Sequence, residues 1–420
     1  MEEGLKYVII VGDGMADYPS DGLGGKTPLM LARTPNMDWM AKHGEVGLVR
    51  TIPEGFNPGS EIANLSIFGY DPVRYYTGRG PLEAASLGVK LQPNDIAFRC
   101  NLVTLEVRGG KSIMEDFSAG HITNDEARQI ISDLNQKMGT EEIRFYAGVS
   151  YRHLMVLRNG ISRFSDLEKV ELVPPHDILD KEISPFLPGR RSPGKSRDLG
   201  EDGDEKILSL TKKSQQLLKN HPVNIAREAK GLKPANSIWL WGQGRSPRMV
   251  TLKERFGIEG YVVSAVHLVK GIGIYAGLEV LEVPGATGYF DTNYDGKAQY
   301  TLKGLKEKDF VYVHVEAPDE AGHMGDPKLK IEAIEVFDEK IVGQILKGMK
   351  DFIKYRIMVL PDHPTPLSLR THAADPVPYV IYSNEDNRRD GRIESFDEDS
   401  ARQSKIFIDE GFKLIERFLS

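Results

Sequence analysis

KYVIIV (residues 6–11) is a short apolar run rich in β-branched residues, and it stops at Gly12-Asp13-Gly14. Such a run, ended by turn residues, predicts a buried strand. Three similar runs lie toward the other end of the chain: FVYVHV (Phe310–Val315), RIMVL (residues 356–360) and YVIY (residues 379–382). These segments decide the fold class, because buried runs of this kind are typical of strands covered on both faces.

A helix is predicted between the second and third of these runs. Within residues 328–350, isoleucines recur at helical spacing with charged residues between them, at Ile331, Ile334, Ile341 and Ile345. Strand, helix and strand form the βαβ unit of a parallel sheet. We therefore expect an α/β fold in which the first strand joins the last three in one mostly parallel sheet. Most of the chain separates these strands, which implies an insertion.

The middle of the chain has a different character. Strands with mixed polar faces are predicted at residues 98–107 and 151–157, and residues 184–203, rich in Pro, Gly and charge, predict a mobile loop. We place an inserted, smaller α+β domain at residues 81–245 and a discontinuous core at residues 1–80 and 246–420. Hinges near the two ends of the insertion would let it close over a substrate.

Composition narrows the possible functions. The 420 residues are 40% hydrophobic and 27% charged, which is ordinary for a globular protein and long enough for two domains. A net charge of −7 argues against nucleic acid as a partner. The single Cys100 excludes an intramolecular disulfide and fits a reducing cytoplasm. With neither a signal peptide nor a long apolar run in the sequence, we expect no membrane contact. The sequence does not predict the oligomeric state.

Ionisable side chains lie close to the ends of the predicted strands, in most cases just after the strand. Because ligand sites in open α/β sheets gather at the carboxyl ends of strands, we expect these side chains to converge. The residues are Asp13, Asp319, His323, Asp362, His363 and His372. Carboxylates and imidazoles without thiolates suit Mn²⁺, Zn²⁺ or Mg²⁺, although imidazoles argue against Mg²⁺ alone. Such a number of ligands indicates two metals, whereas any one residue alone is equally explained as a turn or helix cap.

A nucleophile candidate, Ser60, opens a predicted helix in the stretch SEIANLSIFG. Backbone N–H groups at a helix start can hold a phosphate group. The alternative is that Ser60 is only the N-cap residue of this helix. Ile62 stands where a nucleophile elbow would need glycine, so the motif is not of that kind.

The ordered set of motifs resembles the cofactor-independent phosphoglycerate mutase family of the alkaline phosphatase superfamily, in its archaeal-type branch. The matching stretches are GDGMAD (residues 12–17), GSEIAN (59–64), TGRGPLEA (77–84), PDEAGH (318–323), DHPTP (362–366) and THAADPVP (371–378). The resemblance covers essentially the whole chain and implies an alkaline-phosphatase-like core flanked by helices. One departure is Gly59, because the larger bacterial-type enzymes carry Asn before the serine.

The resemblance implies a role for each of these residues. Ser60 would be the nucleophile that carries the phosphoryl group. Two divalent metal ions would be held, one by Asp319, His323 and His372 and the other by Asp13, Asp362, His363 and the Ser60 oxygen. Mn²⁺ is the favoured ion, with Zn²⁺, Mg²⁺ and Co²⁺ as alternatives. Lys270 would help to offset charge on the phosphoryl oxygens, unless it is a surface residue.

The insertion is expected to bind the glycerate end of the substrate. The candidates are His121, Arg152, His153 and Arg245, with His176 and Asp177 as weaker ones. Arginine suits this task because its planar fork binds carboxylate and phosphate through two hydrogen bonds. The alternatives are that the arginines are ordinary surface residues and that His121 caps the next helix.

These expectations describe a cytoplasmic isomerase that interconverts 3-phospho- and 2-phospho-D-glycerate through a phosphoserine, without 2,3-bisphosphoglycerate. The first alternative is another metal-dependent phosphotransferase or phosphatase, such as a phosphopentomutase or a small-molecule kinase, because these share the core chemistry. The second is a binding or regulatory protein that keeps the fold of an enzyme but has lost its activity. The complete set of ligand residues argues against this alternative. Because histidine must be neutral to bind metal, activity is expected to fall below about pH 6.5.

Overall fold

The computed structural model describes residues 4–164, 167–188, 201–385 and 393–420, except the side chains of Lys169, Glu201 and Asp202. The chain forms two compact units, Met1–Tyr76 with Arg248–Ser420, and Thr77–Pro247. Much of the predicted loop at 184–203 lies outside the described residues; its ends belong to a 3₁₀ turn, η4 (Ser184–Phe186), and to helix α8 (Glu201–Leu218). No helix in the described part of the chain is long and apolar enough to cross a membrane.

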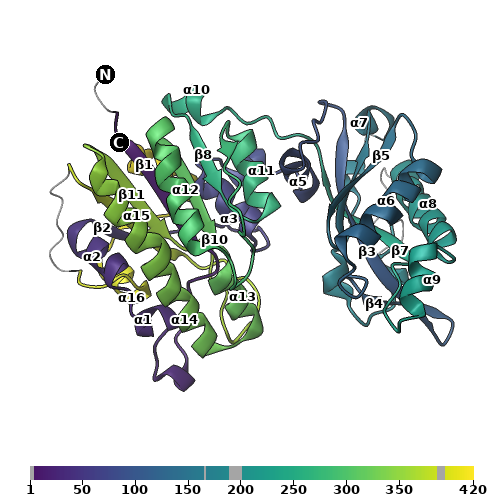
Figure 1. Ribbon diagram of the computed structural model, residues 1–420, viewed down its shortest axis with the longest axis horizontal. Helices are drawn as coiled ribbons and strands as arrows, with labels where there is room; N and C mark the ends of the chain where they lie inside the picture. The colour runs from purple at the N-terminus through teal and green to yellow at the C-terminus, as the bar shows by residue number, and fades with distance from the viewer. Residues whose placement is uncertain (1–3, 165–166, 189–200, 386–392) are drawn as a thin grey trace. The chain divides into compact units, whose positions relative to one another are not determined.

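A sheet of eight described strands forms the centre of the first unit, in the order β13-β2-β12-β11-β1-β10-β8-β9. Figure 1 labels β2, β11, β1, β10 and β8 of this sheet. Its strands are β1 (Lys6–Gly12), β2 (Glu45–Val49), β8 (Gly260–Val263), β9 (Glu279–Val280), β10 (Phe310–Val315), β11 (Tyr355–Leu360), β12 (Val377–Ser383) and β13 (Phe407–Ile408). Strand β1 is parallel to both neighbours, with Ile9 opposite Tyr312 of β10 and Met358 of β11. The α/β class and the joining of both chain ends in one sheet are therefore confirmed.

Strand β12 runs antiparallel to β11, unlike the parallel centre of the sheet. Parallel neighbours need a crossover, usually a helix, whereas the segment between Leu360 and Val377 contains no helix. Because of this reversal, β12 begins at the edge where β1, β10 and β11 end. His372, which precedes β12, is therefore carried to the same edge as the residues that come after the parallel strands.

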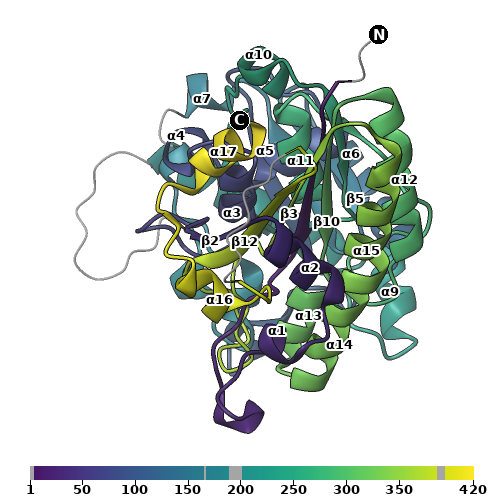
Figure 2. The same cartoon turned by 90° about the vertical axis from the view of Figure 1, so that its left-hand side faces the viewer.

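Helices cover both faces of this sheet (Figures 1 and 2). Val8 and Ile10 of β1 share one core with α2 (Pro35–His43), α12 (Tyr294–Glu307), α14 (Pro327–Phe337) and α15 (Gly343–Gly348). On the other face, Phe68 at the end of α3 (Ser60–Ile67) stacks on Tyr312 with ring centroids 3.9 Å apart. Helices α14 and α15 are joined by a π-helical turn, η5 (Asp338–Val342), so the helix predicted at 328–350 is present with a wide turn in its middle.

The first unit also contains shorter helices. They are η1 (Asp21–Leu23), α1 (Pro28–Leu31), α4 (Pro72–Tyr75), α10 (Leu252–Phe256), α11 (His267–Tyr275), α13 (Ala317–Met324), η6 (Met349–Asp351), α16 (Glu398–Gln403), η7 (Gly411–Lys413) and α17 (Leu414–Leu419). Of these, α13 matters most for function, because it comes directly after β10 at the carboxyl edge of the sheet.

The second unit is built on an antiparallel sheet in which β3 pairs with β4, β6 and β7, and β6 pairs with β5. The strands are β3 (Ile96–Arg108), β4 (Lys111–Asp116), β5 (Ile143–Val149), β6 (Arg152–Leu157) and β7 (Ser237–Gly244). The helices are α5 (Arg79–Ser86), α6 (Asn124–Met138), α7 (Gly160–Arg163), η2 (Leu167–Lys169), η3 (Pro175–Ile178), η4, α8 and α9 (Pro222–Glu228). Strands β3 and β6 confirm the two strands predicted in the middle of the chain.

The two faces of this second sheet differ in polarity. Cys100, Met155 and Leu240 share a buried core with Ile130 of α6 and Leu210 of α8. The neighbouring positions on β3, β6 and β7 point to the opposite face, because side chains alternate along a strand. That opposite face carries the polar and aromatic residues described below.

The chain enters and leaves the second unit through two segments that lie in contact. The Thr77 hydroxyl donates a hydrogen bond of 2.6 Å to the carbonyl oxygen of Arg245. A Cβ atom on Gly78 would clash with the carbonyl of Gln243, and one on Gly244 with the carbonyl of Thr77. Glycine is therefore required at both positions for the two backbones to approach this closely.

Candidate active site

The carboxyl edge of the first unit's sheet gathers the six predicted metal ligands. Asp13 comes directly after β1, Asp319 and His323 lie on α13 after β10, Asp362 and His363 come after β11, and His372 precedes β12. Two sets offer ligand atoms within 4.8 Å of one another: Asp319 with His363 and His372, and Asp13 with Asp362 and His363. Parallel strand ends and the reversed β12 together bring these residues to one place.

His323 lies beside Asp319 and His372 of the first set, although it is not one of the three residues whose ligand atoms all lie within 4.8 Å of one another. His323 is four residues after Asp319 on α13, so both side chains lie on one helix face, with His323 Nε2 3.1 Å from Asp319 Oδ2. His372 Nε2 lies 3.1 Å from His323 Nε2 and 3.6 Å from Asp319 Oδ1. His323 Nδ1 faces the Arg370 carbonyl at 3.0 Å, which assigns the hydrogen to Nδ1 and leaves Nε2 for a metal.

The electrostatics of this set favour a cation. The hydrogen bond with Asp319 raises the pKa of His323 to about 9, in spite of burial. Burial alone would raise the pKa of Asp319, but hydrogen bonds from His323 and His372 hold it well below its usual range. Asp319 also accepts a hydrogen bond from the Thr365 hydroxyl. The carboxylate is thus kept ionised, and the facing nitrogens of His323 and His372 have the geometry of two ligands to one ion.

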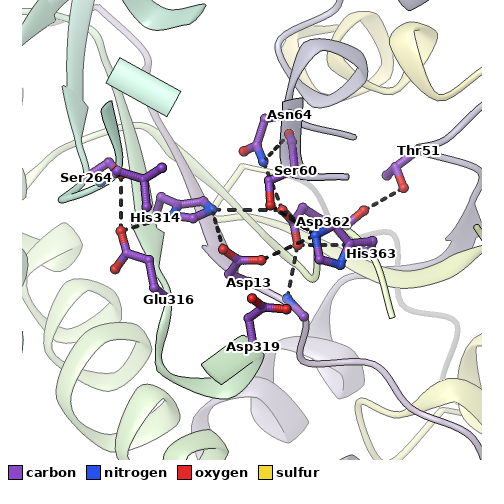
Figure 3. A network of polar contacts seen from close by, with 12 residues as sticks. Asp13, Thr51, Ser60, Asn64, Ser264, His314, Glu316, Asp319, Asp362 and His363 are labelled. Atoms are coloured by element: carbon purple, nitrogen blue, oxygen red, sulfur yellow. Dashed lines mark hydrogen bonds and ion pairs between the residues drawn. The ribbon is translucent and has the colours of Figure 1, made fainter. Parts of the chain in front are cut away.

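The second set surrounds Asp13 and Asp362, which are both buried (Figure 3). His363 Nε2 lies 3.5 Å from Asp13 Oδ1 and 3.5 Å from Asp362 Oδ2. Asp362 accepts backbone hydrogen bonds from Gly14 and His363, of 3.0 and 2.8 Å. Within the described residues, Asp13 Oδ1 is buried without a hydrogen-bond partner. A divalent cation among these groups would provide the missing partner.

The two aspartates of this set are in opposite electrostatic situations. Burial and the neighbouring charges of Asp362 and Asp319 raise the pKa of Asp13 well above its usual value. Asp362 is equally buried, yet the imidazoles of His363 and His314 and its backbone hydrogen bonds hold its pKa below the usual range. Close carboxylates of this kind are characteristic of sites that a metal ion completes.

His363 belongs to both sets, whereas the sequence analysis placed it in the second alone. Its ring lies 4.2 Å from that of His372, which is in the first set. The two sets therefore adjoin each other at His363, as expected for two metal ions a few ångströms apart.

Ser60 points at the second set from the first residue of α3. Its Oγ lies 3.1 Å from His363 Nε2. Gly59 is the N-cap residue of α3, and Ser60 itself is the first residue of the helix and makes no capping hydrogen bond. The alternative that Ser60 serves only as an N-cap is therefore wrong.

Asn64, one helical turn after Ser60, connects the helix to the aspartates. Its Nδ2 donates to the Ser60 carbonyl at 2.9 Å and to Asp362 Oδ2 at 2.9 Å. The Tyr312 hydroxyl donates to Asn64 Oδ1 at 2.5 Å, which fixes the orientation of the amide. Neither Asn64 nor Tyr312 was expected from the sequence to belong to the site. The signal for Asn64 was its spacing of four from Ser60, which places both on one helix face.

Lys270 is buried in α11, and its Nζ lies 2.9 and 2.8 Å from the two carboxylate oxygens of Glu282. Its charge is thus matched by a carboxylate, and the surface alternative is wrong for its side chain. A role toward the phosphoryl group stays a prediction.

A group of arginines lies on the polar face of the second unit's sheet. Arg99 is buried, with Nε 3.0 Å from Glu83 Oε1 and its guanidinium 4.3 Å from the ring centre of Trp241. Arg79 shares both partners, at 3.8 Å from Glu83 and 5.7 Å from Trp241. Arg152, in the strand next to Arg99, is exposed over the ring of Tyr151.

This cluster carries more positive than negative charge. Burial lowers the pKa of Arg99 to about 10. Glu83 acts in the opposite direction and raises this pKa, whereas the charges of Arg79 and Arg152 lower it further. Three neighbouring guanidinium groups suit an anionic ligand. Arg79 lies in the stretch TGRGPLEA, so the motif was noted, but its role and that of Arg99 were missed.

The remaining candidates of the second unit have different surroundings. His121 is exposed, and its ring centre lies 6.3 Å from that of Tyr151; Thr123, not His121, caps α6. Arg245 is exposed, with Nε 3.4 Å from Glu168. His176 packs edge-on against Trp241. These residues lie beside aromatic or acidic neighbours, and their binding roles stay predictions.

His153 is placed differently from its neighbour Arg152. It is buried opposite Cys100, on the face of the sheet that packs against helices, and its Nδ1 accepts a hydrogen bond from the Gly148 backbone. Burial lowers its pKa to about 3. We therefore leave His153 out of the substrate site, because a neutral imidazole in the core cannot reach a ligand on the polar face.

Known proteins resemble this chain in sequence and in fold. Residues 41–224 match the family model described as 2,3-bisphosphoglycerate-independent phosphoglycerate mutase. A probable 2,3-bisphosphoglycerate-independent phosphoglycerate mutase of Geobacter sulfurreducens is 52% identical, over 99% of this chain and 100% of that protein. This chain belongs to the 2,3-bisphosphoglycerate-independent phosphoglycerate mutase family.

Other known proteins resemble this chain in length and fold. The 2,3-bisphosphoglycerate-independent phosphoglycerate mutase of Methanosarcina barkeri is 50% identical over 98% of both chains. A solved protein of Pyrococcus horikoshii, 29% identical, superposes with a TM-score of 0.79 over 100% of this chain and 97% of that one. The cofactor-independent phosphoglycerate mutase of Thermoplasma acidophilum, 27% identical, gives a TM-score of 0.65 over 99% and 100%.

Proposed function

We infer that this chain interconverts 3-phospho- and 2-phospho-D-glycerate without 2,3-bisphosphoglycerate. The observation that carries the inference is the position of Ser60, whose hydroxyl lies 3.1 Å from His363 Nε2 beside buried carboxylates and imidazoles. Relatives at 52% and 50% identity over nearly the whole chain bear the name of this enzyme, which supports the reaction and its substrate.

We propose that the carboxyl edge of the sheet binds two divalent metal ions. The ligands are Asp319, His323 and His372 for one ion, and Asp13, Asp362, His363 and Ser60 Oγ for the other. The unpartnered oxygen of Asp13 and the facing nitrogens of His323 and His372 support this assignment. Mn²⁺ suits such oxygen and nitrogen ligands, with Zn²⁺, Mg²⁺ and Co²⁺ as alternatives. When bound, the ions lower the pKa of the Ser60 hydroxyl and offset charge on the phosphoryl oxygens.

The residues of this chain then act on the substrate in two steps. Ser60 Oγ loses its proton and bonds to phosphorus as the bond from phosphorus to the substrate's C3 oxygen breaks; the C3 oxygen takes up a proton, which leaves a phosphoserine and glycerate. The C2 oxygen of the same glycerate then loses its proton and bonds to phosphorus as the bond from phosphorus to Ser60 Oγ breaks, and Ser60 Oγ takes up a proton. Lys270 is proposed to help offset the charge of the transferring group. Water must be excluded during the exchange, because hydrolysis of the phosphoserine would release phosphate.

We propose that the second unit binds the carboxylate end of glycerate. Arg79, Arg99 and Arg152 supply guanidinium groups near Glu83. His121 and Arg245 are proposed to contribute from the loops beside them. The only cysteine in the sequence, Cys100, is buried in this unit, which supports a cytoplasmic enzyme.

A coupled assay tests the proposed function. The purified chain is given 3-phosphoglycerate and Mn²⁺ without 2,3-bisphosphoglycerate, enolase reports 2-phosphoglycerate, and a parallel assay measures free phosphate. Mutase turnover without phosphate release supports the proposal. Phosphate release in its place would identify a phosphatase, and no turnover with metal bound would direct the search to another phosphorylated substrate.

A further inference from the structure

A buried line of ionisable residues lies beside the proposed second metal site, and Figure 3 shows two of its members, Glu316 and His314. It consists of Lys297 on α12, Glu316 just after β10, and His314 within β10. Lys297 and His314 are 0% exposed and Glu316 is 3% exposed. None of the three was expected from the sequence, because His314 lies inside an apolar run in which nothing distinguishes it from a core residue. None is a proposed metal ligand.

The far end of this line holds the His314 ring in place. Lys297 Nζ lies 2.9 Å from Glu316 Oε2 and donates to the His314 carbonyl at 3.0 Å. Glu316 Oε1 accepts from the backbone N–H of Ala265 at 3.2 Å and lies 3.3 Å from His314 Nδ1. An ionised carboxylate only accepts hydrogen bonds, so His314 Nδ1 is the donor in this contact.

His314, at the other end of this line, faces Asp13 and Asp362. His314 Nε2 lies 3.4 Å from Asp13 Oδ2 and 3.9 Å from Asp362 Oδ2. Within the described residues Nε2 is buried without a hydrogen-bond partner, so its contact with Asp13 is one of close packing. Figure 3 shows the ring directed at both aspartates. His314 is thus held at Nδ1 by Glu316 and packs with Nε2 against the two aspartates.

The two oxygens of Asp13 have different neighbours as a result. Oδ2 faces His314 at 3.4 Å, whereas Oδ1 faces His363 Nε2 at 3.5 Å and has no hydrogen-bond partner among the described residues. Contacts behind a metal ligand commonly fix its orientation in this way. The carboxylate is held so that Oδ1 is directed toward His363, the side on which Ser60 also lies.

We propose that His314 is a positioning residue for the second metal ion, which orients Asp13 by occupying its Oδ2 and is itself held by the Lys297–Glu316 pair. This inference rests on the proposed two-metal site but not on the mutase reaction. A residue that merely fills the core would affect folding, whereas a positioning residue changes the affinity of one metal site and leaves the other unchanged.

The test measures binding of Mn²⁺ alone to the metal-free full chain, by calorimetry and by the EPR signal of free Mn²⁺. His314→Leu is expected to weaken one of two Mn²⁺ sites by at least about tenfold and the other by less than about twofold. His314→Gln, whose amide N–H can reach the place of Nε2, is expected to stay within about threefold of the wild type. Equal affinities in the wild type and His314→Leu would overturn the proposal.

A matched control is His221→Leu in the second unit. His221 is also buried beside a carboxylate, with Nε2 2.9 Å from Asp133 Oδ2, and it contacts none of the proposed ligands. This variant is expected to bind both Mn²⁺ ions as the wild type does. Weakening of the same site by this variant would overturn the proposal, because any loss of a buried imidazole would then suffice.

If His314→Leu does not fold, Glu316→Gln carries the test. It removes the charge beside Nδ1 while keeping a side chain of the same shape, and it is expected to weaken the same single site by about threefold or more. Unchanged binding in a folded Glu316→Gln would overturn the proposal. A wild-type chain that binds fewer than two Mn²⁺ ions would overturn both this inference and the proposed metal site, whereas the mutase assay bears only on the proposed reaction.

Discussion

The hydroxyl oxygen of Ser60 lies 3.1 Å from Nε2 of His363, although 303 positions separate the two residues in the sequence. Ser60→Ala should lower mutase turnover by at least about 1,000-fold, because no other hydroxyl of α3 faces His363. Ser66→Ala is the matched control, since it removes another buried hydroxyl of α3 that has no hydrogen-bond partner in the described chain. It should keep its turnover. Substantial turnover in Ser60→Ala would exclude Ser60 as the nucleophile.

Asn64 should contribute to the stability of the folded protein. Asn64→Asp places a second carboxylate at the position from which Nδ2 now donates to Asp362 at 2.9 Å. We expect the free energy of unfolding of the metal-free protein to fall by about 3 kcal/mol, measured by urea denaturation. Tyr312→Phe, which loses only the hydrogen bond to Asn64 Oδ1, should lose about 1 kcal/mol. An unfolding free energy of Asn64→Asp equal to that of the wild type would contradict this account.

Metal binding should release protons. The pKa of His323 is raised to about 9 by its hydrogen bond with Asp319, so in the metal-free protein it is protonated at pH 7.5 and must lose a proton to bind an ion. The affinity for Mn²⁺ should therefore rise with pH up to about 9, above the value of about 6.5 expected from a free imidazole. Calorimetry in two buffers of different ionisation enthalpy measures the release. His323→Asn should release fewer protons, and equal release in both proteins would argue against the assignment.

Glu398 should make the fold less stable in base than in mild acid. Burial raises its pKa from 4.5 to about 7, so the folded state favours the protonated form. This contribution is fully present below about pH 4.5 and is lost as the pH rises through about 7, by roughly 3 kcal/mol. Between pH 5 and 8 the wild type should lose that much stability relative to Glu398→Gln, measured by urea unfolding at each pH. Parallel pH profiles of the two proteins would rule the effect out.

Arg152 should affect substrate binding without affecting the metals. Arg152→Met removes one guanidinium from the cluster with Arg99 and Arg79, and a charged hydrogen bond is worth about 1.5–3 kcal/mol. The kcat/KM for 3-phosphoglycerate should fall by about 10- to 100-fold while the Mn²⁺ affinities stay constant. Arg128→Met is the control, because Arg128 is an exposed arginine of the same unit paired with Asp125. A kcat/KM unchanged in Arg152→Met would remove Arg152 from the substrate site.

The sequence alone could identify those site residues that directly follow a strand predicted from an apolar run. Asp13, Asp319 and Asp362 come after the apolar runs that form β1, β10 and β11, and parallel strands bring the residues at their carboxyl ends to one edge. Local patterns could not show that β12 is antiparallel, that His363 adjoins both ligand sets, or that His314 inside a fully buried strand packs against Asp13. Those facts depend on partners distant in the chain, as do the buried Arg99 and its contact with Trp241.

The hydrogen bond between Thr77 and Arg245, with Gly78 and Gly244 packed backbone to backbone, has a consequence for how such a chain evolves. The first and last segments of the second unit lie in contact, so this unit is an insertion whose two ends are adjacent. Such an insertion can be exchanged, lengthened or shortened without changing the strand order of the large sheet. Since we propose that the second unit binds the glycerate end of the substrate, substrate preference can change while the residues at the sheet edge stay the same.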